Sequence, residues 1–129
     1  MSDYTPKDGT LDVSKTVHEF MSTIEHNPKK GEYDQLKLFG VNQKIEMFKL
    51  GFSIGYVHQL EFIPKEKGER NTVTPRSFPM ENYRKLLVEE ATERKMSIGG
   101  LLSAYADAGL CHLQQHLDAG NDLMELIEV

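Results

Sequence analysis

The spacing of two histidines, His112 and His116, is the feature that most directly suggests chemistry. They lie four residues apart in a segment with helical periodicity, so both imidazoles can face one metal ion. A structural or catalytic zinc site needs three or four protein ligands. A third ligand from His18, His26 or His58 stays open, and no glutamate separates the pair as it would in a metalloprotease. We predict no metal and no cofactor.

The single cysteine, Cys111, and the nearby acidic residues do not form a catalytic pattern. A nucleophilic thiol needs a base and a stabilised thiolate, whereas Asp107 and Asp118 would oppose the thiolate. We therefore predict a buried structural cysteine. Neither this acidic pair nor the adjacent Glu89 and Glu90 has the spacing of converging catalytic carboxylates. The sequence predicts that the protein is not an enzyme.

Positive charge concentrates in one segment. Residues 41–76 carry six basic and four acidic side chains, whereas residues 97–129 carry five acidic side chains and no lysine or arginine. DNA binding depends on clustered cations, because neutralised phosphates supply much of the affinity. A contact with DNA through the 65–76 loop would therefore use Lys65, Lys67, Arg70 and Arg76. A solvated charged loop is the alternative, and the acidic last third favours a protein partner or solubility.

Apolar periodicity predicts a mainly α-helical fold. Four segments repeat apolar residues every three to four positions, and a short fifth helix closes the chain. The helix starts are marked by capping or proline residues: Asp12 or Ser14, Asn42, Pro79, Ser97 and Asp122. The core stripe expected after Pro79 consists of Tyr83, Leu86, Leu87 and Ala91.

Length and composition favour one domain. The chain has 129 residues, of which 39% are hydrophobic and 27% charged, so a wholly disordered chain is excluded. Residues 1–11 lack any period and are predicted to form a flexible N-terminal arm. Residues 12–129 are predicted to form a single compact domain of four to five helices. A small two-stranded β-ribbon around residues 60–63 and 72–74 is an additional option.

The segment from Asn42 to Gln59 is apolar around most of its circumference, as is typical of a buried helix. It contains Gly51 and Gly55, four residues apart on one side. Each glycine costs about 1 kcal/mol of helix propensity, so we predict that both allow another helix backbone to approach closely. A ligand against the bare backbone is the alternative.

The predicted compartment is the cytoplasm. One cysteine excludes an intramolecular disulfide. The first twelve residues lack the apolar core of a signal peptide, and no apolar stretch is long enough to span a bilayer. We predict no contact with a membrane.

Residues 80–117 also suit a second class of protein. Two helices joined by a tight turn are typical of helix-turn-helix and ribbon-helix-helix regulators. The second helix, after Met96, contains no lysine or arginine, which disfavours groove reading. A small homodimeric DNA-binding transcriptional regulator is therefore the alternative function, and the sequence leaves homo-oligomer formation open.

Residues 36–117 resemble a known bacterial family. The resemblance lies in a glycine-containing apolar helix, FKLGFSIGYVHQLEFIP, followed by a charged loop and a helix pair ending in YADAGLCHL. It is similar to the small associated protein encoded beside DNA phosphorothioation (sulfur modification)-dependent restriction genes. The matching residues are Gly51, Gly55, Tyr105, Ala106, Gly109, Leu110 and Leu113.

This resemblance implies a role without catalysis. It implies a non-enzymatic accessory subunit of an antiviral restriction complex that targets DNA, and it brings no catalytic residues. The expected partners are larger protein subunits of such a defence complex. The absence of a catalytic pattern and the acidic last third of the chain agree with this expectation.

Overall fold

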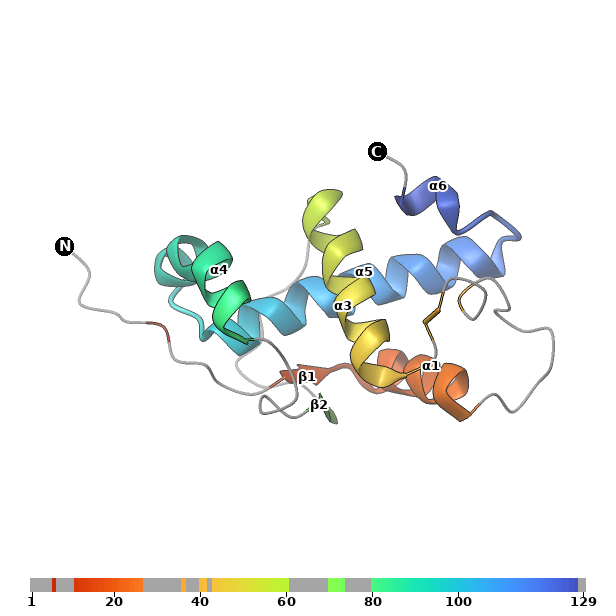
Figure 1. The fold of residues 1–129 in the computed structure, drawn as a ribbon, viewed down its shortest axis with the longest axis horizontal. Helices are drawn as coiled ribbons and strands as arrows, with labels where there is room; N and C mark the ends of the chain where they lie inside the picture. The colour runs from red at the N-terminus through yellow and green to blue at the C-terminus, as the bar shows by residue number, and fades with distance from the viewer. Residues whose placement is uncertain are drawn as a thin grey trace.

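The computed structural model describes residues 6, 11–26, 36, 40–41, 43–60, 70–73 and 80–127. Within these residues the chain forms five helices and two short strands, which confirms the predicted mainly helical fold (Figure 1). The strands are β1 (Leu11–Val13) and β2 (Arg70–Val73). The helices are α1 (Lys15–His26), α3 (Lys44–Val57), α4 (Met80–Arg94), α5 (Ile98–Asp118) and α6 (Met124–Ile127).

Helix α5 organises the molecule. It runs through the domain and contacts α1, α3, α4 and β1 (Figure 1). Helix α3 crosses α5, α4 lies towards the N-terminal end of α5, and α6 lies towards the C-terminal end. The buried face of α5 carries the predicted stripe: Ile98, Leu101, Leu102, Tyr105, Gly109 and Leu113.

The crossing of α3 and α5 confirms the predicted role of the glycines. A Cβ atom at Gly55 would lie against the carbonyl oxygen of Tyr105, and one at Gly109 against the carbonyl oxygen of Gly51. The two backbones therefore touch where side chains would otherwise keep helices 8–10 Å apart. These glycines set the closest contact in the domain core.

The two strands correct the predicted ribbon. β2 does form in the predicted region, but its antiparallel partner is β1, with Leu11 opposite Val73. Residues 61–63 and 74 lie outside the described part of the chain, and Leu60 is not in a strand. Leu11, which the sequence places at the end of a flexible arm, is fully buried.

Strand β1 is held on α5 by two long-range hydrogen bonds. The backbone amide of Asp12 donates to Ser103 Oγ at 3.0 Å, and that of Ser14 donates to Asp107 Oδ1 at 2.8 Å. Asp107 thus has a structural partner. These bonds explain why the domain begins at Leu11 and not after it.

Several helix starts agree with the sequence. Ser97 Oγ accepts from the Gly100 amide at 2.9 Å, and Ser14 Oγ accepts from the Val17 amide at 3.3 Å. Asp122 Oδ1 accepts from the amide of Met124, the first residue of α6. Asn42 lies outside the described residues, and the N-cap of α3 is Gln43, which makes no capping bond.

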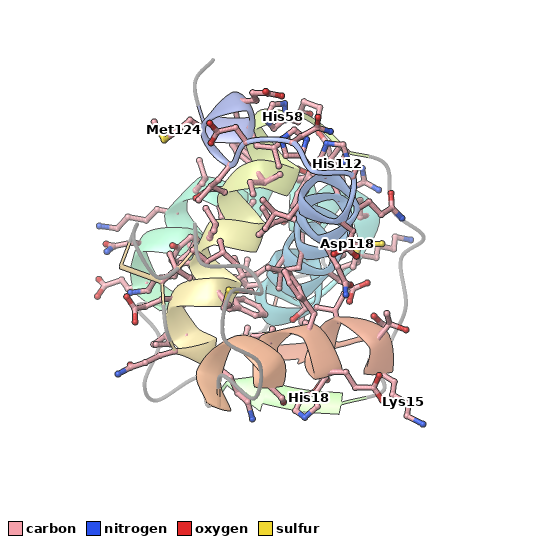
Figure 2. The ribbon with its side chains drawn as sticks, turned by 90° about the vertical axis from the view of Figure 1, so that its right-hand side faces the viewer. Lys15, His18, His58, His112, Asp118 and Met124 are labelled. Carbon is pink, nitrogen blue, oxygen red and sulfur yellow. The ribbon has the colours of Figure 1, made fainter. Side chains whose placement is uncertain are left out.

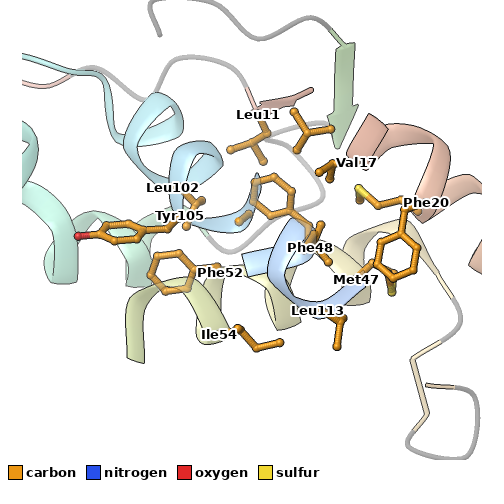
Figure 3. Close-up of a cluster of buried hydrophobic side chains, with 14 of the residues drawn as sticks. Leu11, Val17, Phe20, Met47, Phe48, Phe52, Ile54, Leu102, Tyr105 and Leu113 are labelled. Atoms are coloured by element: carbon orange, nitrogen blue, oxygen red, sulfur yellow. The ribbon is translucent and has the colours of Figure 1, made fainter. Parts of the chain in front are cut away.

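The hydrophobic core lies between α1, α3, α5 and β1 (Figure 3). Phe48 is its largest fully buried side chain, and Met47 is also fully buried. Val17 and Phe20 bring the predicted apolar face of α1 into the same cluster. No helix in the described ranges is long and apolar enough to cross a bilayer.

Candidate functional site

The predicted DNA-contacting residues fall largely outside the described structure. Lys65, Lys67 and Arg76 belong to segments that are not described. The backbone of Arg70 lies in β2 opposite Val13, and its side chain is not described. Direct DNA contact therefore stays a prediction from the sequence.

The histidines do not converge as a metal site in the part of the chain that the structure describes, where no group of three or more suitable ligands occurs. His116 Nε2 lies 2.7 Å from the carbonyl oxygen of Asp122. The ring of His112 instead lies beside that of His58, with 6.4 Å between ring centroids. His18 lies at the opposite end of the molecule in Figure 2, and the side chain of His26 is not described.

The prediction of a buried Cys111 is wrong. Cys111 is exposed on α5, and its Sγ accepts a long hydrogen bond from Gln115 Nε2 at 3.6 Å. Leu110 and Leu113 occupy the buried face of the helix on either side of it. Because each helical residue turns by about 100°, Cys111 then faces outwards.

A polar network links α4 to α5. The Tyr105 hydroxyl donates to both carboxylate oxygens of Glu90, at 2.8 and 2.7 Å. Glu90 Oε2 also accepts from Arg94 Nε at 2.8 Å, which confirms that these residues pair along α4. Burial, and then the Glu90 carboxylate, raise the pKa of Tyr105 to about 12. The predicted "free" carboxylate Glu90 is therefore a structural anchor.

Aromatic rings surround the same junction. Phe52 stacks on Tyr56 with 5.4 Å between centroids, and its ring meets Tyr83 and Tyr105 edge-on at 5.0 and 6.0 Å. Tyr56 also meets Tyr105 edge-on at 5.4 Å. Burial raises the pKa of Tyr83. Such pairs contribute about 1 kcal/mol each beyond their buried area, so α3, α4 and α5 are fixed together here.

The sequence identified the members of this junction separately but not their contact. Tyr83 and Tyr105 both fall on predicted apolar stripes, and Glu90 on a predicted ion pair. The contact itself depends on how α4 folds back along α5 after the turn at Lys95, whose φ is 56°. A tyrosine on one apolar stripe facing a glutamate at the edge of another was the available signal.

Helix α4 exposes apolar side chains that the sequence placed in the core. Leu87 and Ala91 are fully buried against the domain, as predicted. Leu86 is 50% exposed, which corrects its assignment to the buried stripe, and Val88 is 39% exposed. The two flank the buried side of the helix, because each lies about 100° from Leu87. We call Leu86 and Val88 the α4 apolar flanks.

Two further large apolar side chains are exposed, at the other end of the domain. Val57, at the end of α3, is 51% exposed, and Met124, on α6, is 39% exposed. No protein-family model, curated protein or solved structure matches the chain. The geometry of these surfaces is accordingly the basis for a functional proposal.

Proposed function

We propose that this protein is a non-enzymatic accessory subunit that binds a larger protein partner in a DNA-targeting defence complex. The observation that carries the proposal is helix α4. It attaches to the domain by one face, at one end of α5, and exposes Leu86 and Val88 on its flanks (Figure 1).

Helix α4 suits recognition by a partner because it is preformed. The Tyr105–Glu90 bonds and the contact of Tyr83 with Phe52 fix it to α5 and α3. A helix that is already ordered loses less conformational entropy on binding than a flexible segment does. An apolar groove on a partner could therefore enclose it, as in other helix-in-groove complexes.

The wider setting of the proposal rests on the resemblance of residues 36–117 to the restriction-associated family. The glycines that carry the resemblance, Gly51, Gly55 and Gly109, lie at the crossing of α3 and α5. They support a shared core arrangement and not a shared binding site. DNA targeting would be a property of the assembled complex, to which this chain contributes docking.

Partner binding can be tested by capture from the native host with the purified, tagged chain. Replacing the α4 apolar flanks, Leu86→Ser with Val88→Ser, should reduce the recovered partner at least tenfold, which corresponds to about 1.4 kcal/mol. Ser53→Asp, a change at an exposed position on α3, is the control and should leave recovery unchanged. Capture that is equal for both variants, or absent for the wild type, would overturn the proposal.

Direct DNA contact has its own test, the salt dependence of binding to a DNA duplex. Changing Lys65, Lys67, Arg70 and Arg76 together to alanine should make the plot of log affinity against log salt shallower by about 3. Arg84→Ala with Lys85→Ala removes two cations from α4 and should leave the slope as it is. An unchanged slope in the fourfold variant removes DNA contact from the proposal. Salt-sensitive binding of a homodimer to a palindromic duplex would favour the regulator instead.

A further inference from the structure

We infer that α6 is a displaceable strap, held at the ends of α3 and α5 by His58 and His116, and that its seat accepts a leucine-bearing helical segment of a partner. The identity of the occupant as a partner segment rests on the proposed protein-binding function. The intramolecular strap does not depend on that function.

Two imidazoles hold the segment through its backbone. His58 Nε2, at the end of α3, lies 2.8 Å from the carbonyl oxygen of Leu126, and His116 Nε2, on α5, lies 2.7 Å from that of Asp122. A carbonyl oxygen only accepts, so each Nε2 carries the proton and donates it. Figure 2 shows His58 beside α6, with His112 next to it. The two histidines thus bond the beginning and the end of the segment.

The buried side chains of the segment are two leucines. Leu123 is 2% exposed and Leu126 is 7% exposed, and both belong to the same hydrophobic cluster as Ile54 of α3 and Leu113 of α5. Met124 between them is exposed. We call the part of this cluster on α3 and α5 the α6 seat. The segment defines what fits there: two leucines three residues apart, and carbonyl oxygens that meet two imidazoles.

The short length of α6 makes its docking the source of its order. Helix α6 has four residues, far fewer than the roughly 12 that an isolated helix needs in water. It follows a reversal at Gly120, where φ is 84°. A partner segment with the same two leucines and a longer helix would compete for the seat, in the manner of a helix binding a groove.

The strap itself is tested by amide hydrogen exchange in the full chain. His58→Ala with His116→Ala should speed exchange of the Glu125 and Leu126 amides at least tenfold. These amides donate to the carbonyls of Asp122 and Leu123. His112→Ala removes the neighbouring ring and is the control, for which exchange should not change. Unchanged exchange at both amides in the double variant, with α3 and α5 still protected, would overturn the strap.

The seat is tested with a labelled peptide of residues 119–129. In the full chain, Leu123→Ser with Leu126→Ser should release the strap, so the peptide should bind this variant at least tenfold more tightly than the wild type. A peptide carrying the same two serines should not bind, and adding His58→Ala with His116→Ala should abolish binding. Where circular dichroism shows loss of helix in the double serine variant, Leu126→Ser alone serves.

The outcomes separate the two proposals. Equal binding of both peptides to a folded, strap-released chain would overturn the seat, even where partner capture through α4 succeeds. Leucine-dependent peptide binding supports the seat, even where capture fails after the α4 change or without it. The second result would assign partner binding to this end of the domain and not to α4.

Discussion

Gly109→Ala is expected to lower the free energy of unfolding by about 3 kcal/mol, the upper end of the usual cost of overpacking, and Tm by roughly 10 °C. The new Cβ would meet the carbonyl oxygen of Gly51. It would also lie 2.7 Å from the carbonyl carbon of Gly51 and 2.8 Å from the amide nitrogen of Gly55. All three atoms are backbone, so no side-chain rotation can make room. Helices α3 and α5 must separate along their shared face.

The sign of this effect decides between packing and propensity. In an exposed helix, glycine to alanine would stabilise by about 1 kcal/mol. Cys111→Leu is the control, because it adds more volume to the same helix at an exposed position and should change stability by less than about 0.5 kcal/mol. Urea unfolding followed by circular dichroism measures both variants. A Gly109→Ala protein as stable as the wild type would show that the helices do not cross at this point.

The glycine crossing could be predicted because it is written in local sequence. Gly51 and Gly55 lie in an otherwise apolar helix, where their cost in propensity needs a compensating contact. The caps at Ser14 and Ser97 are predictable for the same reason, since each side chain bonds a backbone amide within one turn. Such features depend on three or four neighbouring residues and on nothing more distant.

The features that the sequence missed depend on distant contacts. Strand β1 has three residues and pairs with a strand about sixty residues later in the chain, so no local alternation could identify its partner. Leu86 follows the apolar period of α4, but α4 covers α5 with too narrow a face to bury it. Cys111 was misassigned because cysteine is buried on average, whereas helical phase decides at this position.

The candidate surfaces show the same division. The composition of the 65–76 segment makes it the natural place for a DNA contact, whatever the fold. The α4 apolar flanks and the α6 seat could not be predicted, because exposure is the outcome of packing. His58 and His116 lie 58 residues apart, and only the crossing of α3 and α5 brings both to α6.

Tyr105→Phe is expected to cost about 1.5 kcal/mol near neutral pH, because the Glu90 carboxylate loses a charge-assisted hydrogen bond. Glu90 keeps its bond to Arg94 and is 27% exposed, so solvent limits the loss. The more distinctive effect lies at high pH. The folded protein raises the pKa of Tyr105 from 10.0 to about 12, through burial first and Glu90 second.

The sign of the pH effect follows from linkage. A raised pKa means that the folded state holds the phenol proton more tightly than the unfolded chain does. This stabilisation is fully present below pH 10 and is lost as the pH rises from 10 through about 12. At 1.36 kcal/mol per pKa unit, the wild type should lose about 2 kcal/mol more than Tyr105→Phe across this window.

Two further variants isolate the role of the carboxylate. Glu90→Gln removes its charge and should move the loss of stability to lower pH, because burial alone then raises the pKa of Tyr105. Glu89→Gln makes the same change at the neighbouring, exposed residue and should leave the wild-type profile intact. Urea unfolding at pH 8 to 12, with tyrosinate absorbance at each pH, gives these profiles. Parallel profiles for wild type and Tyr105→Phe would mean that the hydroxyl is not held by Glu90, and α4 would lose its polar anchor on α5.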